Sequence, residues 1–274
     1  MNQGGFVMDS RDAEKNAGRF RGFADLYDRA RPAMPAFPVQ MIERYLGRTP
    51  ETVIDLGCGT GLSTAAWKGR CRRAIGVEPS EDMLKRAQKK SDDTISFVQA
   101  YAHDTGLAEG CADAVVCSQS FHWMEPVSSL REIHRLLTDG GVFATVDCEW
   151  PPVTNWQAEY EYQKLYDKIK RYEADLPDVN ASFVRYEKKN HLANIKESGL
   201  FRYCREIHFA NAEGGTAQRL IDLLLSQGSL QTLWKLHPEL IAQDLERFEK
   251  SLADRLGEAE FEIVFSYTMR IAVK

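Results

Sequence analysis

Glycine occupies every second position of a short loop, Gly57 to Gly61, that directly follows the apolar run 53–56. Glycine lets the backbone turn sharply and lets a ligand approach the main chain closely. Because ordinary turns also use glycine, the loop alone says little. Two carboxylates strengthen the case for a binding site, since Asp55 stands just before the loop and Glu78 follows the next apolar run. Together these residues predict a binding loop for a ligand that contains a nucleoside.

The charges around this loop distinguish two kinds of ligand. A carboxylate at the position of Glu78 can accept hydrogen bonds from both hydroxyls of a ribose. A dinucleotide loop would carry GxGxxG, its third glycine opening a helix beneath a pyrophosphate, but Leu62 occupies that position. The acidic Asp55 also suits an ammonium group better than a pyrophosphate. The loop therefore favours S-adenosylmethionine, a nucleoside with a cationic amino-acid tail, over NAD.

Alternating strands and helices position this loop. Short apolar runs predict strands, and amphipathic spacing between them predicts helices. The predicted strands are 53–56, 74–77, 95–99, 113–117 and 142–148, and the helices between them are 62–68, 81–89 and 127–137, with a turn at 139–141. This alternation predicts an α/β fold with a doubly wound, mostly parallel sheet and a ligand site at the carboxyl ends of its strands.

The pattern divides the chain into three parts. Residues 1–17 are polar and predict a flexible tail, and residues 18–150 form the cofactor-binding core with a helix at its amino end, carrying Phe20 and Tyr27. Residues 151–274 predict helical cap insertions plus the last two strands. Within this third part the helices are expected at 156–172, 191–198, 218–226 and 238–256, and the strands at 201–209 and 261–273.

Composition limits the class of protein. The chain has 274 residues, and its 35 basic and 40 acidic side chains give a charge of −5 without a basic patch, which argues against a nucleic-acid partner. No apolar run approaches the roughly 20 residues of a membrane span, and no signal-peptide core is present at the amino end. The six cysteines form no CxxC pair, so we expect neither disulfides nor a metal site. A cytoplasmic protein with a small-molecule substrate is expected, and the oligomeric state is left open.

Residues 53–61, Val-Ile-Asp-Leu-Gly-Cys-Gly-Thr-Gly, resemble the cofactor loop of class I S-adenosylmethionine-dependent methyltransferases, and Glu78 matches their ribose-binding acid. Residues 113–123 and 27–32 resemble the small-molecule branch that includes the trans-aconitate methyltransferases. The resemblance covers about residues 20–150. It implies a Rossmann-like, seven-stranded sheet in the order 3-2-1-4-5-7-6, with strand 7 antiparallel, and a helical cap.

The resemblance also implies a set of cofactor-binding residues on the loops after the first four strands and on the amino-terminal segment: Tyr27, Arg31, Asp55, Gly57, Cys58, Gly59, Gly61, Glu78, Pro79, Met83, Ala100, Tyr101, Ala102, Ser118 and Gln119. In this set Asp55 and the loop glycines line the methionine portion, and Pro79 and Met83 flank the adenine. Arg31 either pairs with the cofactor carboxylate or is an ordinary surface arginine. Many relatives have an acidic residue where this chain has Tyr101, so a stacking or backbone contact is expected there instead.

His122 is the candidate catalytic residue, because it is the only histidine at a predicted strand end near the glycine loop. It would remove a proton from a hydroxyl or amine acceptor, or else only orient a carboxylate, which needs no base. Arg185 could orient a carboxylate as well. Trp123 and Tyr160 are candidate walls of the substrate pocket, although an aromatic helix face such as that of Tyr160 is also typical of a core.

The sequence thus predicts an enzyme that transfers a methyl group from S-adenosylmethionine to a small-molecule acceptor by in-line displacement, with a carboxylate as one candidate acceptor. Two alternatives remain at this point. The chain could bind the cofactor without turnover, as a sensor or partner protein, or it could be an NAD-dependent oxidoreductase.

Overall fold

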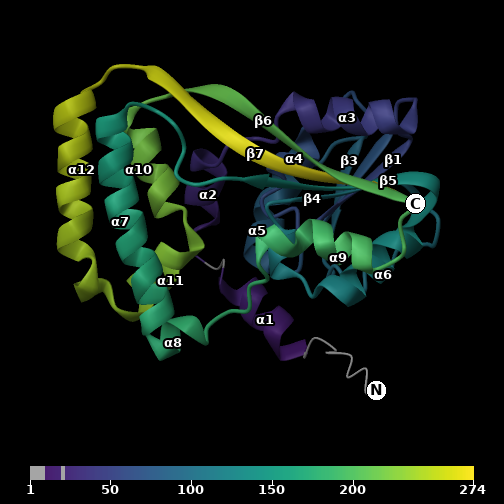
Figure 1. The fold of residues 1–274 in the computed structure, drawn as a ribbon, viewed down its shortest axis with the longest axis horizontal. Coiled ribbons are helices and arrows are strands. Elements are labelled where there is room, and N and C mark those ends of the chain that lie inside the picture. Colours follow the sequence, from purple (N-terminus) through teal and green to yellow (C-terminus); the bar gives the residue numbers. More distant parts are fainter. Residues whose placement is uncertain (1–9, 20–21) are drawn as a thin grey trace.

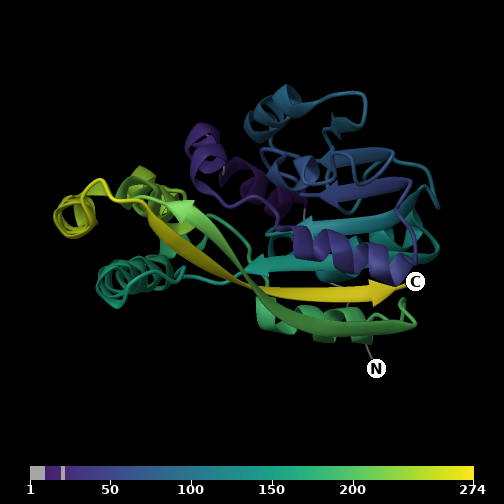
Figure 2. The ribbon, with the colours of Figure 1, turned by 90° about the horizontal axis from the view of Figure 1, so that it is seen from above.

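Seven strands form one twisted sheet in the order β3-β2-β1-β4-β5-β7-β6 (Figures 1 and 2). The computed structural model describes residues 10–19 and 22–274. Only β7 runs antiparallel to its neighbours β5 and β6, so the predicted topology is confirmed. The strands are β1 Thr52–Leu56, β2 Arg73–Val77, β3 Ile95–Val98, β4 Ala112–Ser118, β5 Leu137–Cys148, β6 Tyr203–Gly215 and β7 Phe261–Val273.

The apolar strands bury both faces of the sheet, because successive side chains point to opposite sides. Val53 packs into the core that includes Ile42 of the helix α3. Its neighbour Ile54 packs into the second core, which includes Ile133 of the helix α6. Figure 1 shows α3 on one side of the sheet and α6 with α9 on the other. These helices span α3 Ala36–Leu46, α6 Pro126–Leu136 and α9 His191–Glu197.

The parallel register brings the loops after β1, β2 and β4 to one edge of the sheet. Leu56 pairs with Val77, and Asp55 pairs with Val116. The short helices α4 Leu62–Ala65 and α5 Glu81–Ala87 begin directly beyond this edge. The glycine loop therefore lies where the sequence places it, between the carboxyl ends of adjacent strands.

A second group of helices stands away from the sheet, and we call it the helical lobe (Figure 1). It consists of α7 Trp156–Asp175, α8 Pro177–Asn180, α10 Ala217–Leu225, α11 Gly228–Leu236 and α12 Ala242–Leu256. Strands β6 and β7 reach it as a two-stranded ribbon, because β5 pairs only with residues 267–273 of β7 whereas β6 pairs with its whole length. The lobe and the parallel-strand edge face each other.

Several predicted boundaries are wrong. The predicted tail 1–17 contains most of the helix α1 Ser10–Arg19. Although this segment is polar, Ala13 and Asn16 form a buried face through which the helix packs against the rest of the protein. Residues 1–9 and Phe20 lie outside the described residues. The predicted amino-terminal helix is present as α2 Ala24–Ala30, whereas the helix 62–68 ends at Ala65.

Three further differences fall in the second half of the chain. The turn at 139–141 lies within β5, where the register with β4 shifts. The helix α11 was not predicted, and the predicted helix 238–256 is divided into a short 3-10 turn and α12.

Among the described residues, no helix has the length and apolar character needed to cross a membrane. All six cysteines are free.

Candidate active site

Two adjoining pockets lie between the sheet edge and the helical lobe. The first, which we call the glycine-loop pocket, encloses about 1200 Å³, part of it open to solvent, and is lined by the loops after β1 to β4 together with α1 and the segment after α2. The second, which we call the basic pocket, encloses about 1110 Å³ between those loops and the helical lobe. Both pockets share the wall residues Tyr27, Arg31, Gln119, Trp123, Cys148 and Trp150.

Close packing explains two of the three loop glycines. Gly57 has a φ of 67°, and a Cβ atom there would lie 2.6 Å from the Cβ of Ser120, so the loop after β1 lies directly on the loop after β4. Gly61 has a φ of 83°, and its Cβ would lie 2.8 Å from the ring of Phe97. Gly61 therefore serves packing against β3, and it does not line the pocket.

Glu78 is held rigidly at the end of β2. Its Oε2 accepts a hydrogen bond of 2.9 Å from the backbone N–H of Gly59, and its Oε1 accepts one of 2.8 Å from that of Ser80. Burial raises the pKa of this carboxyl to about 7, although the two N–H groups favour the ionised form. The result is a fixed acceptor on the wall of the glycine-loop pocket, where a ligand hydroxyl can donate to it.

Asp55 lies behind this wall and not in it. Its Oδ2 accepts hydrogen bonds from Ser63 Oγ at 2.6 Å and from Thr64 Oγ1 at 2.7 Å, and the side chain does not line the pocket. Burial raises its pKa to about 6. The Oδ2 atom of Asp55 thus fixes the first turn of α4 against the loop, whereas its Oδ1 has no hydrogen-bond partner in the structure. A direct contact between Asp55 and the cofactor stays a prediction.

The other predicted cofactor residues divide in the same way. Ala100 does not line this pocket and packs against the core that includes Leu56 and Val77, whereas the next two residues, Tyr101 and Ala102, line the pocket. The structure places the remaining predicted residues on the glycine-loop pocket: Tyr27, Arg31, Gly57, Cys58, Gly59, Glu78, Pro79, Met83, Tyr101, Ala102, Ser118 and Gln119. The ring of His103 stacks on that of Tyr101 with 5.7 Å between the centroids, so an aromatic pair stands at this edge of the pocket.

Helix α1 closes one side of both pockets. Its Asn16 is clamped by three hydrogen bonds: Nδ2 donates to the carbonyls of Trp123 and Val184 at 2.9 and 2.8 Å, and Oδ1 accepts from Val184 N at 2.9 Å. Ala13 and Asn16 line the glycine-loop pocket, whereas Arg19 lines the basic pocket. This role could not be predicted from the sequence, because the helix lies in a segment of polar composition.

Gln119 stands where the two pockets meet. It is the only described non-glycine residue with a positive φ, 56°, a conformation that costs energy and that concentrates at functional sites. Its Oε1 accepts from Lys188 Nζ at 3.3 Å, and its Nε2 has no partner in the structure. The amide therefore offers a free donor at the junction.

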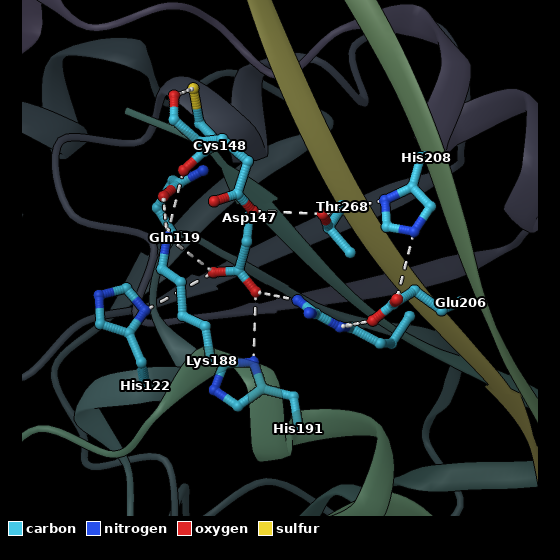
Figure 3. A network of polar contacts seen from close by, with 11 residues as sticks. Gln119, His122, Asp147, Cys148, Lys188, His191, Glu206, His208 and Thr268 are labelled. Atoms are coloured by element: carbon cyan, nitrogen blue, oxygen red, sulfur yellow. Dashed lines mark hydrogen bonds and ion pairs between the residues drawn. The ribbon is translucent and has the colours of Figure 1, made fainter. Parts of the chain in front are cut away.

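His122 lines the basic pocket, beside a buried carboxylate that sequence reasoning missed (Figure 3). Asp147, near the end of β5, has its Oδ1 3.7 Å from His122 Nδ1 and 3.3 Å from Lys188 Nζ. Its Oδ2 lies 3.2 Å from His191 Nδ1 and 2.8 Å from Arg270 Nη1. These partners hold the pKa of Asp147 well below its usual range despite burial.

Burial dominates the titration of His122. It lowers the pKa of the imidazole to about 3, against the opposing attraction of Asp147, so the ring is neutral at physiological pH. A general base works best with a pKa near the operating pH, and His122 is far below it. The arrangement suits a neutral side chain that orients a ligand in the basic pocket.

Charges of one sign dominate the basic pocket. Its wall carries six cations, Arg19, Arg31, Lys170, Arg185, Lys188 and Lys189, but only two carboxylates, Glu149 and Glu187. Cations still exceed carboxylates by two when Asp147 and Glu173, which lie behind the wall, are included. The pocket therefore attracts anions.

The predicted substrate residues are partly correct in position. Trp123 is a wall of both pockets, and Arg185 lines the basic pocket. Tyr160 is wrong, because it lies 62% exposed on the outer side of α7 and lines neither pocket. Tyr166, from the same helix, lines the basic pocket instead. A helix of 20 residues with tyrosines on more than one side does not reveal which side faces inward.

Comparison with known proteins identifies the family. A sequence profile for the methyltransferase domain matches residues 54–145. The chain is 30% identical over 167 residues to the demethylmenaquinone methyltransferase of Clavibacter sepedonicus, across 60% of this chain and 67% of that protein. The chain belongs to the class I S-adenosylmethionine-dependent methyltransferases. Its cofactor is S-adenosylmethionine, which agrees with the glycine loop and the fixed acid Glu78.

Two further relatives extend this result. The protein CRG1 of Saccharomyces cerevisiae, assigned as an S-adenosylmethionine-dependent methyltransferase, is 28% identical over 152 residues, across 51% of this chain and 52% of that protein. A protein of Anaeromyxobacter dehalogenans assigned as a type II methyltransferase shares the fold, with a TM-score of 0.66, 19% identity, and coverage of 89% of this chain and 97% of that one. The chain spans about half the length of several curated relatives it matches. Sequence similarity is thus confined to part of each protein, whereas similarity of fold extends over most of this methyltransferase.

Proposed function

We propose that this chain transfers the methyl group of S-adenosylmethionine to a carboxylate of a small molecule. The observation that carries the proposal is the excess of cationic side chains around the basic pocket, which shares a wall with the glycine-loop pocket. The likeness of residues 113–123 to the small-molecule branch supports a small acceptor. The name of the Clavibacter sepedonicus relative also specifies a small acceptor, demethylmenaquinone.

We place the cofactor in the glycine-loop pocket with its ribose at Glu78. Glu78, already fixed by two backbone N–H groups, accepts from the ribose hydroxyls. Pro79 and Met83 then flank the adenine, and Tyr101 with His103 forms the edge beside it. This orientation leaves the methionine portion to the shared wall between the two pockets.

Arg31 and Gln119 serve the methionine end of the cofactor. Arg31 lies over the rings of Trp150 and Tyr27, with its Cζ 4.6 and 5.1 Å from their centroids, and it donates to Ser226 of the segment between α10 and α11. A guanidinium held in this way is positioned to receive a carboxylate. The free Nε2 of Gln119 supplies a second donor on the same shared wall of the two pockets.

The charges of the basic pocket select among acceptors. An ammonium acceptor is repelled by the surplus of cations, and an alcohol needs a base with a higher pKa than that of His122. A carboxylate is attracted and is already ionised at neutral pH. His122 and Lys188 then orient it, and no proton has to be removed.

Positioning and exclusion of water account for the remaining chemistry. When bound, S-adenosylmethionine supplies a methyl carbon on a sulfonium, and a carboxylate oxygen that attacks it forms a methyl ester while the C–S bond breaks and its electron pair stays on sulfur. The residues of this chain hold the two reactants in line. Trp123 and Trp150 line both pockets at the junction, and α1 closes one side of it, so these groups reduce the access of water once both reactants are bound.

The test is a product assay with saturating S-adenosylmethionine and a panel of carboxylic acids, alcohols, phenols and amines. Mass spectrometry finds the methylated products, and alkaline hydrolysis separates esters from ethers and amines. We expect esters, and we expect His122→Asn to retain turnover because no base is required. Methylation of alcohols or amines alone refutes the carboxylate acceptor. Tight binding of S-adenosylhomocysteine with no product across the panel favours the cofactor-binding sensor.

A further inference from the structure

Three cations converge on one carboxylate at the far side of the basic pocket. Arg19 of α1, Lys170 of α7 and Arg185 all contact Glu173, and we call these three side chains the distal cation cluster. Arg19 Nη2 lies 3.5 Å from Glu173 Oε2, and Arg185 Nη2 lies 2.8 Å from Oε1, the oxygen that also accepts from Lys170 Nζ. All three cations line the pocket, whereas Glu173 does not. One buried carboxylate is thus shared by three positive charges.

Arg19 is deeply buried for a charged side chain. Only 2% of its side chain is exposed, and its Cζ lies 3.9 Å from the ring centroid of Phe183 and 4.9 Å from that of Trp123. Burial lowers its pKa to about 10. Its Nε and Nη1 have no hydrogen-bond partner, and neither has the Nε2 of Gln227 on the same pocket wall. Buried donors without acceptors are rare in folded proteins, since each costs free energy.

The other charges of the pocket do not compensate this cluster. Lys188 and Arg270 already balance Asp147 at the opposite end. The wall carboxylates Glu149 and Glu187 form no ion pair with these three cations in the described part of the chain, and Glu149 Oε1 accepts instead from Thr268 Oγ1 at 3.2 Å. The distal cation cluster therefore sets three positive charges against one carboxylate, Glu173, which leaves two positive charges in excess at this end of the pocket.

The cluster is separate from the position of methyl transfer but within reach of it. The ring of Trp123 neighbours both His122 and Arg19, with its centroid 4.7 Å from the ring centroid of His122 and 4.9 Å from Arg19 Cζ. Arg19 Cζ is therefore no more than about 10 Å from the His122 ring. That distance lies within the length of a small extended molecule.

We propose that the distal cation cluster binds a second anionic group of the acceptor, so that the substrate is a small molecule with two anionic ends. This rests on the proposed function, because the first anion is the carboxylate that accepts the methyl group. The second end is a carboxylate or a phosphate-like group, which share the charge and the acceptor oxygens that guanidinium groups bind. Binding of this end fixes the direction in which the acceptor enters and brings its other carboxylate to the junction of the pockets.

The test compares dianions with monoanions on protein saturated with S-adenosylhomocysteine. Isothermal titration measures the affinity of the dicarboxylates from malonate to suberate, each against the monocarboxylate of the same chain length, and 3-phosphonopropionate tests the phosphate-like end. We expect at least one dianion to bind about tenfold or more tightly than its monoanion, the size of one charge-assisted hydrogen bond. If no dianion binds more tightly than its monoanion, the proposal is wrong.

Two matched variants locate the effect. Arg185 is partly exposed and forms an ion pair with Glu173. Lys189 lines the same pocket but, among the described residues, forms no ion pair with that carboxylate. We expect Arg185→Gln to abolish the preference for the dianion and Lys189→Gln to preserve it. Equal losses in both variants refute the cluster and indicate attraction by the general field of the pocket. Lys170→Gln repeats the test if Arg185→Gln does not fold.

The outcomes also separate this proposal from the proposed function. Methyl ester formation on monocarboxylates, without any preference for dianions, retains the proposed function and refutes the distal site. Preferential dianion binding that depends on Arg185, without ester formation on any acid, retains the distal site and refutes the proposed reaction.

Discussion

Replacing Glu78 by glutamine tests the ribose-binding role of this carboxylate. Both oxygens of Glu78 accept from backbone N–H groups, of Gly59 and Ser80. A glutamine has only one oxygen, so its amide NH₂ must face one of these donors. We expect the conflict to lower the free energy of unfolding by about 1–3 kcal/mol, the cost of an unsatisfied buried group.

The effect on cofactor binding follows from the same geometry. A hydrogen bond to a charged acceptor is worth about 1.5–3 kcal/mol, and Glu78→Gln converts the acceptor of the ribose hydroxyls into a neutral one. A loss of about 2 kcal/mol corresponds to about 30-fold in the dissociation constant of S-adenosylhomocysteine. Isothermal titration measures it, and Glu81→Gln, which removes an exposed carboxylate outside the pocket, is the control.

The pH dependence gives an independent check on Glu78. Its pKa of about 7 in the free protein means that below pH 7 the carboxyl is largely protonated, whereas hydrogen bonds from the ribose favour the carboxylate. Binding must then release a proton, so wild-type affinity falls as the pH falls, by up to about tenfold per unit. The difference between wild type and Glu78→Gln should shrink accordingly. A correctly folded Glu78→Gln with wild-type affinity at pH 8 would refute the role of this residue.

Three further predictions concern the loop, the cover and the histidine. Gly57→Ala should destabilise the fold by about 1–3 kcal/mol more than Gly69→Ala in thermal unfolding. Both glycines have a positive φ, but only at position 57 would the new Cβ atom clash with another side chain, that of Ser120. Equal costs would contradict the packing argument. Asn16→Ala should speed dissociation of S-adenosylhomocysteine in stopped-flow experiments by loosening α1, whereas Glu14→Ala, on the exposed side of α1, should not. The imidazole of His122 should show no titration in NMR spectra between pH 8 and pH 5, since its pKa is lowered to about 3. In the unfolded chain the same imidazole takes up its proton near pH 6.5. The free energy of unfolding should therefore be unaffected by this group above pH 6.5 and should decrease as the pH falls from 6.5 toward 3. A midpoint near 6.5 in the folded protein would contradict the assignment of a neutral histidine.

The sheet and the glycine loop could be predicted because their signals are local. The apolar runs of β1 to β5 are bounded by turns, and Glu78 ends β2 at the position where a parallel sheet presents its ligand site. The sequence could not show how Asp55 is held inside the loop. Two hydroxyls, at Ser63 and Thr64, bind it inside the loop, and their positions in the sequence carry no mark of that contact.

The basic pocket could not be predicted in the same way. Arg19, Lys170 and Lys188 come from three separate parts of the chain and meet only after the helical lobe packs against the sheet edge. Each of them occurs in a polar segment where a solvated charge is the ordinary expectation. Tyr160 illustrates the opposite error, since an aromatic residue on a long helix was assigned to a pocket but lies on its outer side.

The ribbon formed by β6 and β7 sets the distance between the lobe and the sheet, because residues 261–266 of β7 lie beyond the end of β5 and pair with β6. The segment after β5 joins them at two points, where Glu149 N donates to the Ser266 carbonyl and Val153 pairs with Val264. Adding two residues to each strand of this ribbon would lengthen it by about 7 Å without altering the alternation of side chains. Such an insertion leaves the nucleoside-binding loops unchanged, whereas it changes the volume of the basic pocket between these loops and the helical lobe. The ribbon is thus a spacer. By changing its length, evolution or protein engineering can adapt the same sheet and nucleoside-binding loops to acceptors of different length.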